Sequence, residues 1–214
     1  MTAPLHLFSA ARSSASYRVR IALNMKGVAY DQTPIDLRKG EQRAAAFKAH
    51  NPQGLVPALI AGGLTLTQSP AIIEWLDEAY PEPALLPADR DGRARVRALA
   101  AVIACDIHPI NNLRVLGYLQ NQLKLDEEAR NTWYRHWVNE GFAALETLLS
   151  QGGSGDFCHG DRPGLADLHL VPQVFNAQRF EVDMAPYPTI RRIDAACRAL
   201  PAFAAAAPER QPGF

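Results

Sequence analysis

The segment RSSASYRVRIAL, from Arg12 to Leu23, places one arginine and three serines immediately before an amphipathic stretch. Hydroxyl groups and a cation at the start of a helix favour a bound anion, because the N–H groups of a first helical turn have no partner within the helix. The segment contains no nucleophile stronger than a hydroxyl. The pattern therefore predicts a site that stabilises a negative charge brought by a ligand.

A second anion site is predicted in the segment TQSPAIIEWL, where a strand ends and a helix begins. We expect Ser69 to be the N-cap and Pro70 the first helical residue. Gln68 and Ser69 would then lie at the positive end of the helix dipole, which favours a carboxylate. Taken alone, the pattern favours a serine N-cap without a ligand.

In NPQGLVPALI, a loop containing Gly54 leads into a strand through the Val56–Pro57 bond. This bond is a candidate cis peptide, although the dipeptide alone favours trans, because only about 5–6% of X–Pro bonds in folded proteins are cis.

Residues 1–80 are predicted to form alternating strands and helices that could position these segments. Apolar spacing and turn residues predict strands, helices and a hairpin with its turn at Gly62 and Gly63, in the order β-α-β-α-β-β-α. The expected elements are strands at 5–8, 29–36, 56–60 and 64–67, and helices at 16–27, 41–50 and 69–80. This order indicates a small α/β domain with a mixed sheet.

Three prolines within seven residues make residues 81–92 a linker. The remaining segment, 93–214, has helical patterns and no convincing strand, so it is expected to form an all-α domain. Its helices are predicted at 93–123 with a bend at Pro109, and at 126–151, 165–180 and 187–200.

Composition excludes several other classes of protein. Lys and Arg total 22, as do Asp and Glu, so there is no basic excess to favour nucleic acid or a membrane surface. No apolar run approaches the roughly 18 residues of a membrane span. The 6 histidines lack metal-binding spacings. The 3 separated cysteines and the lack of a basic, apolar leader indicate free thiols in the cytoplasm.

Several of these segments, taken in order, resemble one family. RSSASYRVRIAL is followed by NPQGLVPAL, QSPAIIEWL, LLPADRDGRARVR and DIHPINN. Together they resemble the zeta class of glutathione transferases, in particular its bacterial maleylpyruvate and maleylacetoacetate isomerases, over nearly the whole chain. The resemblance implies a thioredoxin-like N-terminal domain that binds glutathione and a helical C-terminal domain for the second substrate. It also implies a homodimer.

The resemblance also implies roles for individual residues. The candidate catalytic hydroxyls are Ser13, Ser14 and Ser16, and Pro57 would be a structural cis proline. The candidate ligands of substrate carboxylates are Arg12, Arg179 and Arg114, although a solvated surface charge is the alternative for each. Glutathione would be bound by Ser13, Ser14, Ala15, Ser16, Tyr17, Arg18, Gln42, Val56, Gln68, Ser69, His108, Asn112, Leu113 and Arg114.

The implied chemistry uses a borrowed thiol. A free thiol has a pKa of about 8.5, and hydroxyl donors at a helix N-terminus lower that pKa by stabilising the thiolate. We expect Ser13 to donate to the glutathione sulfur, with Ser14 or Ser16 assisting. The thiolate would add to the cis double bond of a small dicarboxylic keto acid, the new single bond would rotate, and elimination would give the trans isomer. No metal is needed.

This chain departs from the family pattern at three positions. Ala15 stands where relatives often have a cysteine, so the chemistry cannot require a protein thiol there. Leu113 stands where a maleylpyruvate isomerase can have an arginine, which weakens that substrate assignment. Gly164 replaces a helix-capping threonine, at an expected cost of a few tenths of a kcal/mol.

Two other functions stay open at this point. The same thiolate could conjugate or dehalogenate small α-halo acids as a general transferase. The fold could also serve as a non-catalytic ligand-binding module, although the serine cluster and Gln68–Ser69 argue against that. A disulfide oxidoreductase is disfavoured because no C-x-x-C motif is present.

Overall fold

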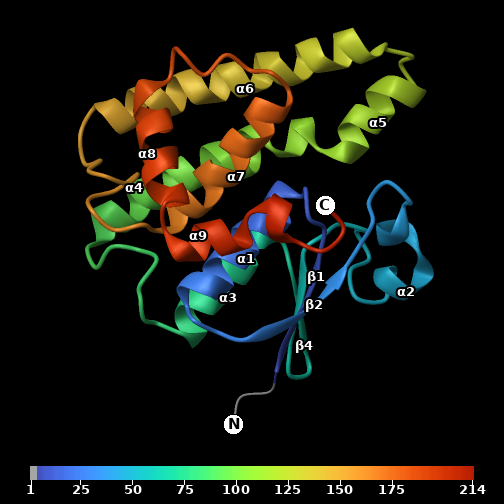
Figure 1. Ribbon diagram of the computed structural model, residues 1–214, viewed down its shortest axis with the longest axis horizontal. Helices are drawn as coiled ribbons and strands as arrows, with labels where there is room; N and C mark the ends of the chain where they lie inside the picture. The colour runs from blue at the N-terminus through green and yellow to red at the C-terminus, as the bar shows by residue number, and fades with distance from the viewer. Residues whose placement is uncertain (1–3) are drawn as a thin grey trace. The chain divides into compact units, whose positions relative to one another are not determined.

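A computed structural model describes residues 4–214 of the chain (Figure 1). Contacts group the chain into two units. Unit 1 contains the residues up to Ala84 together with Ala199–Phe214, and unit 2 is Leu85–Arg198. This grouping differs from the boundaries expected from the sequence in two ways. A helix already begins at Arg90, inside the expected linker, and the last sixteen residues, 199–214, pack with unit 1.

Unit 1 contains one mixed four-stranded sheet in the order β2-β1-β3-β4. Its strands are β1 Leu5–Ser9, β2 Tyr30–Pro34, β3 Ala58–Ala61 and β4 Leu64–Thr67. β1 is parallel to β2 and antiparallel to β3, and β3 pairs with β4 in an antiparallel hairpin. Gly62 has a φ of 63°, which favours glycine in this tight turn. The predicted α/β class and the hairpin are confirmed.

The helices of unit 1 are α1 Ser14–Met25, α2 Ala45–Lys48, α3 Ser69–Ala79 and α9 Pro201–Ala206. α1 packs against α3 and α9. In Figure 1, α1 and α3 lie on one side of the sheet and α2 lies on the other. The helix predicted over 41–50 is interrupted, because Ala44 is extended between a 3₁₀ turn at Glu41–Arg43 and α2.

Unit 2 is helical, as predicted. Its α-helices are α4 Arg90–Ala101, α5 Leu113–Asn121, α6 Glu127–Ser150, α7 Leu165–Arg179 and α8 Pro188–Arg198. α7 is buried from Leu165 to Ala177 and packs against α4 and α8, so it forms the centre of this unit. No helix within residues 4–214 is long and apolar enough to span a membrane.

The helix predicted over 93–123 with a bend at Pro109 is interrupted there more fully than a bend. α4 passes into a π-helical segment at Val102–Ile107, and a 3₁₀ turn at Pro109–Asn111 follows before α5 begins. Pro109 cannot donate a helical hydrogen bond, and π segments of this kind often occur beside functional sites.

Gly164 at the start of α7 is required by close packing. A Cβ at this position would lie 2.8 Å from the carbonyl oxygen of Leu85. Asp167 still closes this end of the helix, because its Oδ2 accepts from the N–H of Gly164 at 2.8 Å. Glycine at position 164 therefore reflects this close approach, and the carboxylate half of the capping box remains.

Candidate active site

Ser13 ends the loop before α1 as the N-cap of the helix. Its Oγ accepts from the backbone N–H of Ser16 at 3.2 Å. A serine hydroxyl that accepts in this way keeps its own hydrogen for donation. Ser13 is partly exposed, and Ser14 next to it is buried as the first helical residue. The first turn has no acidic side chain. This helix end therefore offers a hydroxyl donor in a setting that favours an anion.

Three other residues of the predicted glutathione set, Ala15, Ser16 and Tyr17, are buried in α1. The Oγ of Ser16 accepts from the backbone N–H of Ala10 at 3.3 Å. Burial leaves the backbone as the means by which these three residues could contact a ligand. Ser14 is buried as well, so Ser13 is the most exposed of the three candidate catalytic hydroxyls.

Arg20 has a positioning role that sequence reasoning missed. Its guanidinium is fully buried and donates to Ser9 Oγ at 2.9 Å and to carbonyls of the loop before α1. The carbonyl acceptors are Ala10 at 3.2 Å, Ala11 at 3.0 Å and, in α9, Ala206 at 3.0 Å. Burial lowers the pKa of Arg20 to about 10. Arg20 thus fixes the loop that carries Arg12 and Ser13.

The start of α3 differs from the prediction by one residue. Gln68, and not Ser69, is the N-cap, and its side chain makes no capping hydrogen bond. Gln68 has a φ of 68°, in the left-handed region that non-glycine residues rarely occupy. Its Nε2 donates to Gln53 Oε1 at 2.7 Å. Strained backbone of this kind is concentrated at ligand sites, and the uncapped end favours an anion.

A buried arginine links the two helix ends of unit 1. Arg18 of α1 donates through Nη1 to Ser69 Oγ of α3 at 3.3 Å. Both residues are almost fully buried. The link brings a positive charge to the start of α3, where it adds to the helix dipole.

The loop before β3 completes the part of the predicted glutathione set that lies in unit 1. The Val56–Pro57 bond is cis, and Val56 lies two residues before β3 begins. Asn51, which the sequence reading overlooked, stabilises the loop because its Nδ2 donates to Leu55 O at 2.6 Å. Gln42 is buried, and its Oε1 has no hydrogen-bond partner among the described residues. Such an orphaned acceptor fits a ligand with an N–H donor.

The remaining predicted glutathione residues belong to unit 2. His108 lies between the π segment and Pro109, while Leu113 and Arg114 are exposed at the start of α5. Asn112 is the N-cap of α5, and its Oδ1 accepts from the N–H of Arg114 at 3.0 Å. Asn112 Oδ1 also accepts from the N–H of Val115 at 3.2 Å, so within this side chain the N–H₂ group is left for a ligand.

Asn111, beside it, was missed by the sequence reading. It is buried, and neither of its amide atoms has a hydrogen-bond partner in the described chain. Buried polar groups normally have partners, so an amide in this state fits a bound ligand or water. The only signal in the sequence was its place in the polar run INN.

The candidate substrate arginines divide between the two units. Arg12 in unit 1 is exposed, with its guanidinium carbon 4.6 Å from the centre of the Phe214 ring. Arg179 in unit 2 is also exposed and donates through Nη1 to Asn176 Oδ1 at 3.3 Å. Arg114 is exposed as well. A guanidinium is suited to a substrate carboxylate because it can bind both oxygens.

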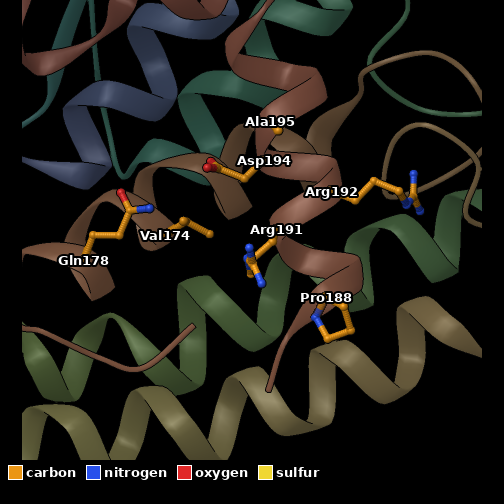
Figure 2. A pocket seen from close by; sticks show the side chains of 7 residues that line it. All are labelled: Val174, Gln178, Pro188, Arg191, Arg192, Asp194 and Ala195. Atoms are coloured by element: carbon orange, nitrogen blue, oxygen red, sulfur yellow. The ribbon is translucent and has the colours of Figure 1, made fainter. Parts of the chain in front are cut away.

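A hollow of about 540 Å³ lies between α7 and α8 of unit 2 (Figure 2). Its lining residues are Val174, Gln178, Pro188, Arg191, Arg192, Asp194 and Ala195. Two of its charges already have partners: Arg192 donates to Gly155 O at 2.7 Å, and Asp194 Oδ2 accepts from Arg198 at 2.8 Å. No residue of the predicted site lines this hollow.

Comparisons with known proteins agree with these features. Residues 3–78 match the glutathione S-transferase N-terminal domain. A maleylpyruvate isomerase from Ralstonia sp. is 56% identical over 209 residues, with 97% of this chain and 99% of the relative covered.

Two solved structures are similar over almost their whole length. A holo maleylpyruvate isomerase, described as a bacterial zeta-class glutathione S-transferase, has a TM-score of 0.95 at 57% identity and covers 97% of this chain and 98% of its own. A maleylacetoacetate isomerase from Methylobacterium extorquens AM1, with bound malonate and glutathione, has a TM-score of 0.95 at 44% identity, with the same shares covered. The chain therefore belongs to the glutathione S-transferase family, within the zeta class.

Proposed function

We propose that the protein is a glutathione-dependent cis–trans isomerase that converts maleylacetoacetate or maleylpyruvate to the fumaryl isomer. The observation that carries this proposal is the pair of helix N-termini in unit 1, joined by the bond from Arg18 to Ser69 Oγ at 3.3 Å. One end presents the Ser13 hydroxyl and the other is uncapped. Relatives named as isomerases of these two acids support the choice of reaction.

Glutathione fits the residues of unit 1. Its two carboxylates and thiol need anion-stabilising groups, and its peptide needs backbone partners. The uncapped start of α3, at Gln68 and Ser69, suits the γ-glutamyl carboxylate. The backbone of Val56, outside the β3 ladder, suits the peptide as an added strand. The orphaned Gln42 Oε1 suits an N–H donor.

Bound glutathione supplies a thiolate that adds reversibly to the maleyl double bond, so that rotation can occur before elimination. Ser13 donates its hydroxyl hydrogen to the sulfur and holds it as the anion, and Ser14 assists. Arg12 and Arg179 bind substrate carboxylates, and Arg114 is a third candidate. In this proposal His108 and Asn112 contact glutathione from unit 2, along with Leu113 and Arg114.

A direct assay tests the proposal. Maleylpyruvate and maleylacetoacetate are supplied side by side to the purified protein, with and without glutathione, and a small α-halo acid is supplied in parallel. We expect conversion of at least one maleyl acid to its fumaryl isomer, and only with glutathione present. Turnover of the halo acid alone would contradict the assignment.

The role of Arg12 has its own test. Arg12→Ala is expected to lower kcat/KM for the maleyl acid well beyond twofold, because an arginine–carboxylate pair is a strong charge-assisted contact. The matched control is Arg90→Ala, since Arg90 is an exposed arginine whose ion pair, with Asp91 at 3.1 Å, is also exposed. A change within twofold for Arg12→Ala would remove Arg12 from the site.

We also propose that the protein works as a homodimer in the cytoplasm. The zeta-class resemblance supports the dimer. All three cysteines are free thiols, which supports a reducing compartment. Sedimentation equilibrium of the purified protein at several concentrations tests the dimer, and fractionation of the source cells tests the location.

A further inference from the structure

Arg179, the candidate carboxylate ligand at the end of α7, is supported by neutral groups from α6 and α7. Its Nη1 donates to Asn176 Oδ1 at 3.3 Å. Its guanidinium carbon lies 5.8 Å from the centres of the Phe175 and Phe180 rings. An arginine within about 6 Å of a ring centre is attracted to the face of the ring without losing its charge.

The side chains that contact Arg179 are held in place by packing. The ring of Phe180 stacks on that of Tyr134, with 3.6 Å between ring centres and 10° between planes. Tyr134, Gln173 and Asn176 are all buried. Asn176 is therefore fixed in place, and Phe180 is supported from below by a buried ring.

The support is also uncharged. Asn176 and Gln173 carry amides. Burial raises the pKa of Tyr134 to about 12, while the neighbouring amides of Gln173 and Asn176 and the charge of Arg179 act in the opposite direction. The phenol is therefore neutral near pH 7. A carboxylate in the place of the Asn176 amide would hold the guanidinium equally well but would neutralise it.

We infer that Asn176 and Phe180 are positioning residues that orient Arg179 for a substrate carboxylate without adding a negative charge beside it, with Tyr134 supporting Phe180. This inference rests on the proposed function, because it assigns the Arg179 guanidinium to a dicarboxylic substrate. It makes the neutrality of Asn176 a determinant of affinity for acidic substrates.

The test uses Asn176→Asp, which keeps the shape and the acceptor but adds a negative charge. The matched control is Asn139→Asp in α6, because Asn139 Oδ1 also accepts a hydrogen bond, from Tyr187 at 3.0 Å. For the full chain with glutathione, we measure kcat and KM for the maleyl acid, and the dissociation constant of malonate by calorimetry. Arg179→Ala provides the reference for loss of the guanidinium.

We expect Asn176→Asp to raise the substrate KM and the malonate dissociation constant roughly tenfold, approaching Arg179→Ala, because a charge-assisted contact is lost. kcat should stay within about twofold, since the thiolate is stabilised in unit 1. Asn139→Asp should match the wild type. A wild-type affinity for malonate in Asn176→Asp, or in Arg179→Ala, would overturn the inference.

A second pair of variants covers the case in which Asn176→Asp fails to fold. Phe180→Tyr keeps the ring face, whereas Phe180→Leu keeps apolar bulk without it. We expect Phe180→Leu alone to weaken malonate binding, by roughly threefold, and equal affinities of the two would overturn the inference. Failure of the wild type to isomerise either acid would refute the proposed function, while the malonate comparison would still decide this inference.

Discussion

The N-termini of α1 and α3 lie in the same unit and both carry serines, yet they differ in how they are capped. At α1, Ser13 accepts from the N–H of Ser16, so the helix caps itself and presents a hydroxyl. At α3, Gln68 makes no side-chain cap, and Ser69 Oγ instead accepts from Arg18. The first end therefore suits a small anion that needs one donor. The second suits a carboxylate that takes the place of the missing cap.

This difference in capping indicates that the two helix ends have different roles in the use of glutathione. The end of α1 should set the reactivity of glutathione, and the end of α3 should set its affinity. Changes at α1 are then expected in kcat and in the thiol pKa, whereas changes at α3 are expected in the KM for glutathione.

The largest effect is expected at Ser13. Ser13→Ala and Ser13→Gly both remove the hydroxyl and should both lower kcat on the order of 10²-fold, as loss of one donor to a catalytic anion does. They should differ in stability, because alanine at an N-cap costs about 1 kcal/mol and glycine only a few tenths. Steady-state kinetics and urea unfolding separate the two effects. Wild-type kcat in either variant would contradict the role of α1.

The second-largest effect is expected when a negative charge is introduced at the N-terminus of α3. Gln68→Asp places a carboxylate at the open helix end and should raise the KM for glutathione roughly tenfold or more through like-charge repulsion. The neutral control is Gln68→Asn, which also tolerates a positive φ. Equal KM values for the two variants would show that no glutathione carboxylate lies there.

A smaller effect is expected for Ser69→Ala. The variant removes one acceptor of Arg18 and should lower the free energy of unfolding by about 1–3 kcal/mol, as loss of a hydrogen bond to a charged group does. The KM for glutathione should rise a few fold, while kcat stays unchanged. Ser150→Ala, at an exposed serine that donates to Thr147 O at 2.9 Å, is the control. A fall in kcat without a change in KM would reverse the assigned roles.

The smallest effect is expected for Ala15→Cys. The backbone at position 15 belongs to α1 and its side chain is buried, so a thiol there should not replace that of glutathione. We expect kcat/KM with glutathione to stay within about twofold, and no turnover without glutathione. Turnover without glutathione in this variant would mean that a protein thiol can do the chemistry.

Much of the fold could be predicted from periodicity and turn residues. The β3–β4 hairpin follows from Gly62–Gly63 between two apolar runs, and α6 begins after Asp126 as its N-cap. Pro109 predicted a bend between α4 and α5, but the π segment at Val102–Ile107 could not be predicted, because its residues keep an apolar helical pattern. The place of α9 depends on long-range contacts, such as Asn24 Nδ2 to Ala202 O at 3.0 Å, that no local pattern encodes.

Some residues of the candidate site could be predicted from the sequence, and others could not. Ser13, Gln68 and Ser69 could be proposed from the sequence because residues at the start of a helix have a local signature. Arg20 looked like one more charge on an amphipathic helix, and its role depends on carbonyls brought together by folding. For Asn111 the sequence offered only its place in a polar segment, and for Asn176 it offered no signal, since burial decides what their amides can do.

The most direct test of the account is the pKa of the glutathione thiol when bound to the protein. Ultraviolet absorbance of the thiolate, titrated against pH, gives this pKa for the wild type and for Ser13→Ala. We predict a wild-type pKa below the value of about 8.5 for a free thiol, and a return towards that value in Ser13→Ala. The same lowered pKa in both proteins would contradict the claim that the α1 hydroxyl stabilises a borrowed thiolate.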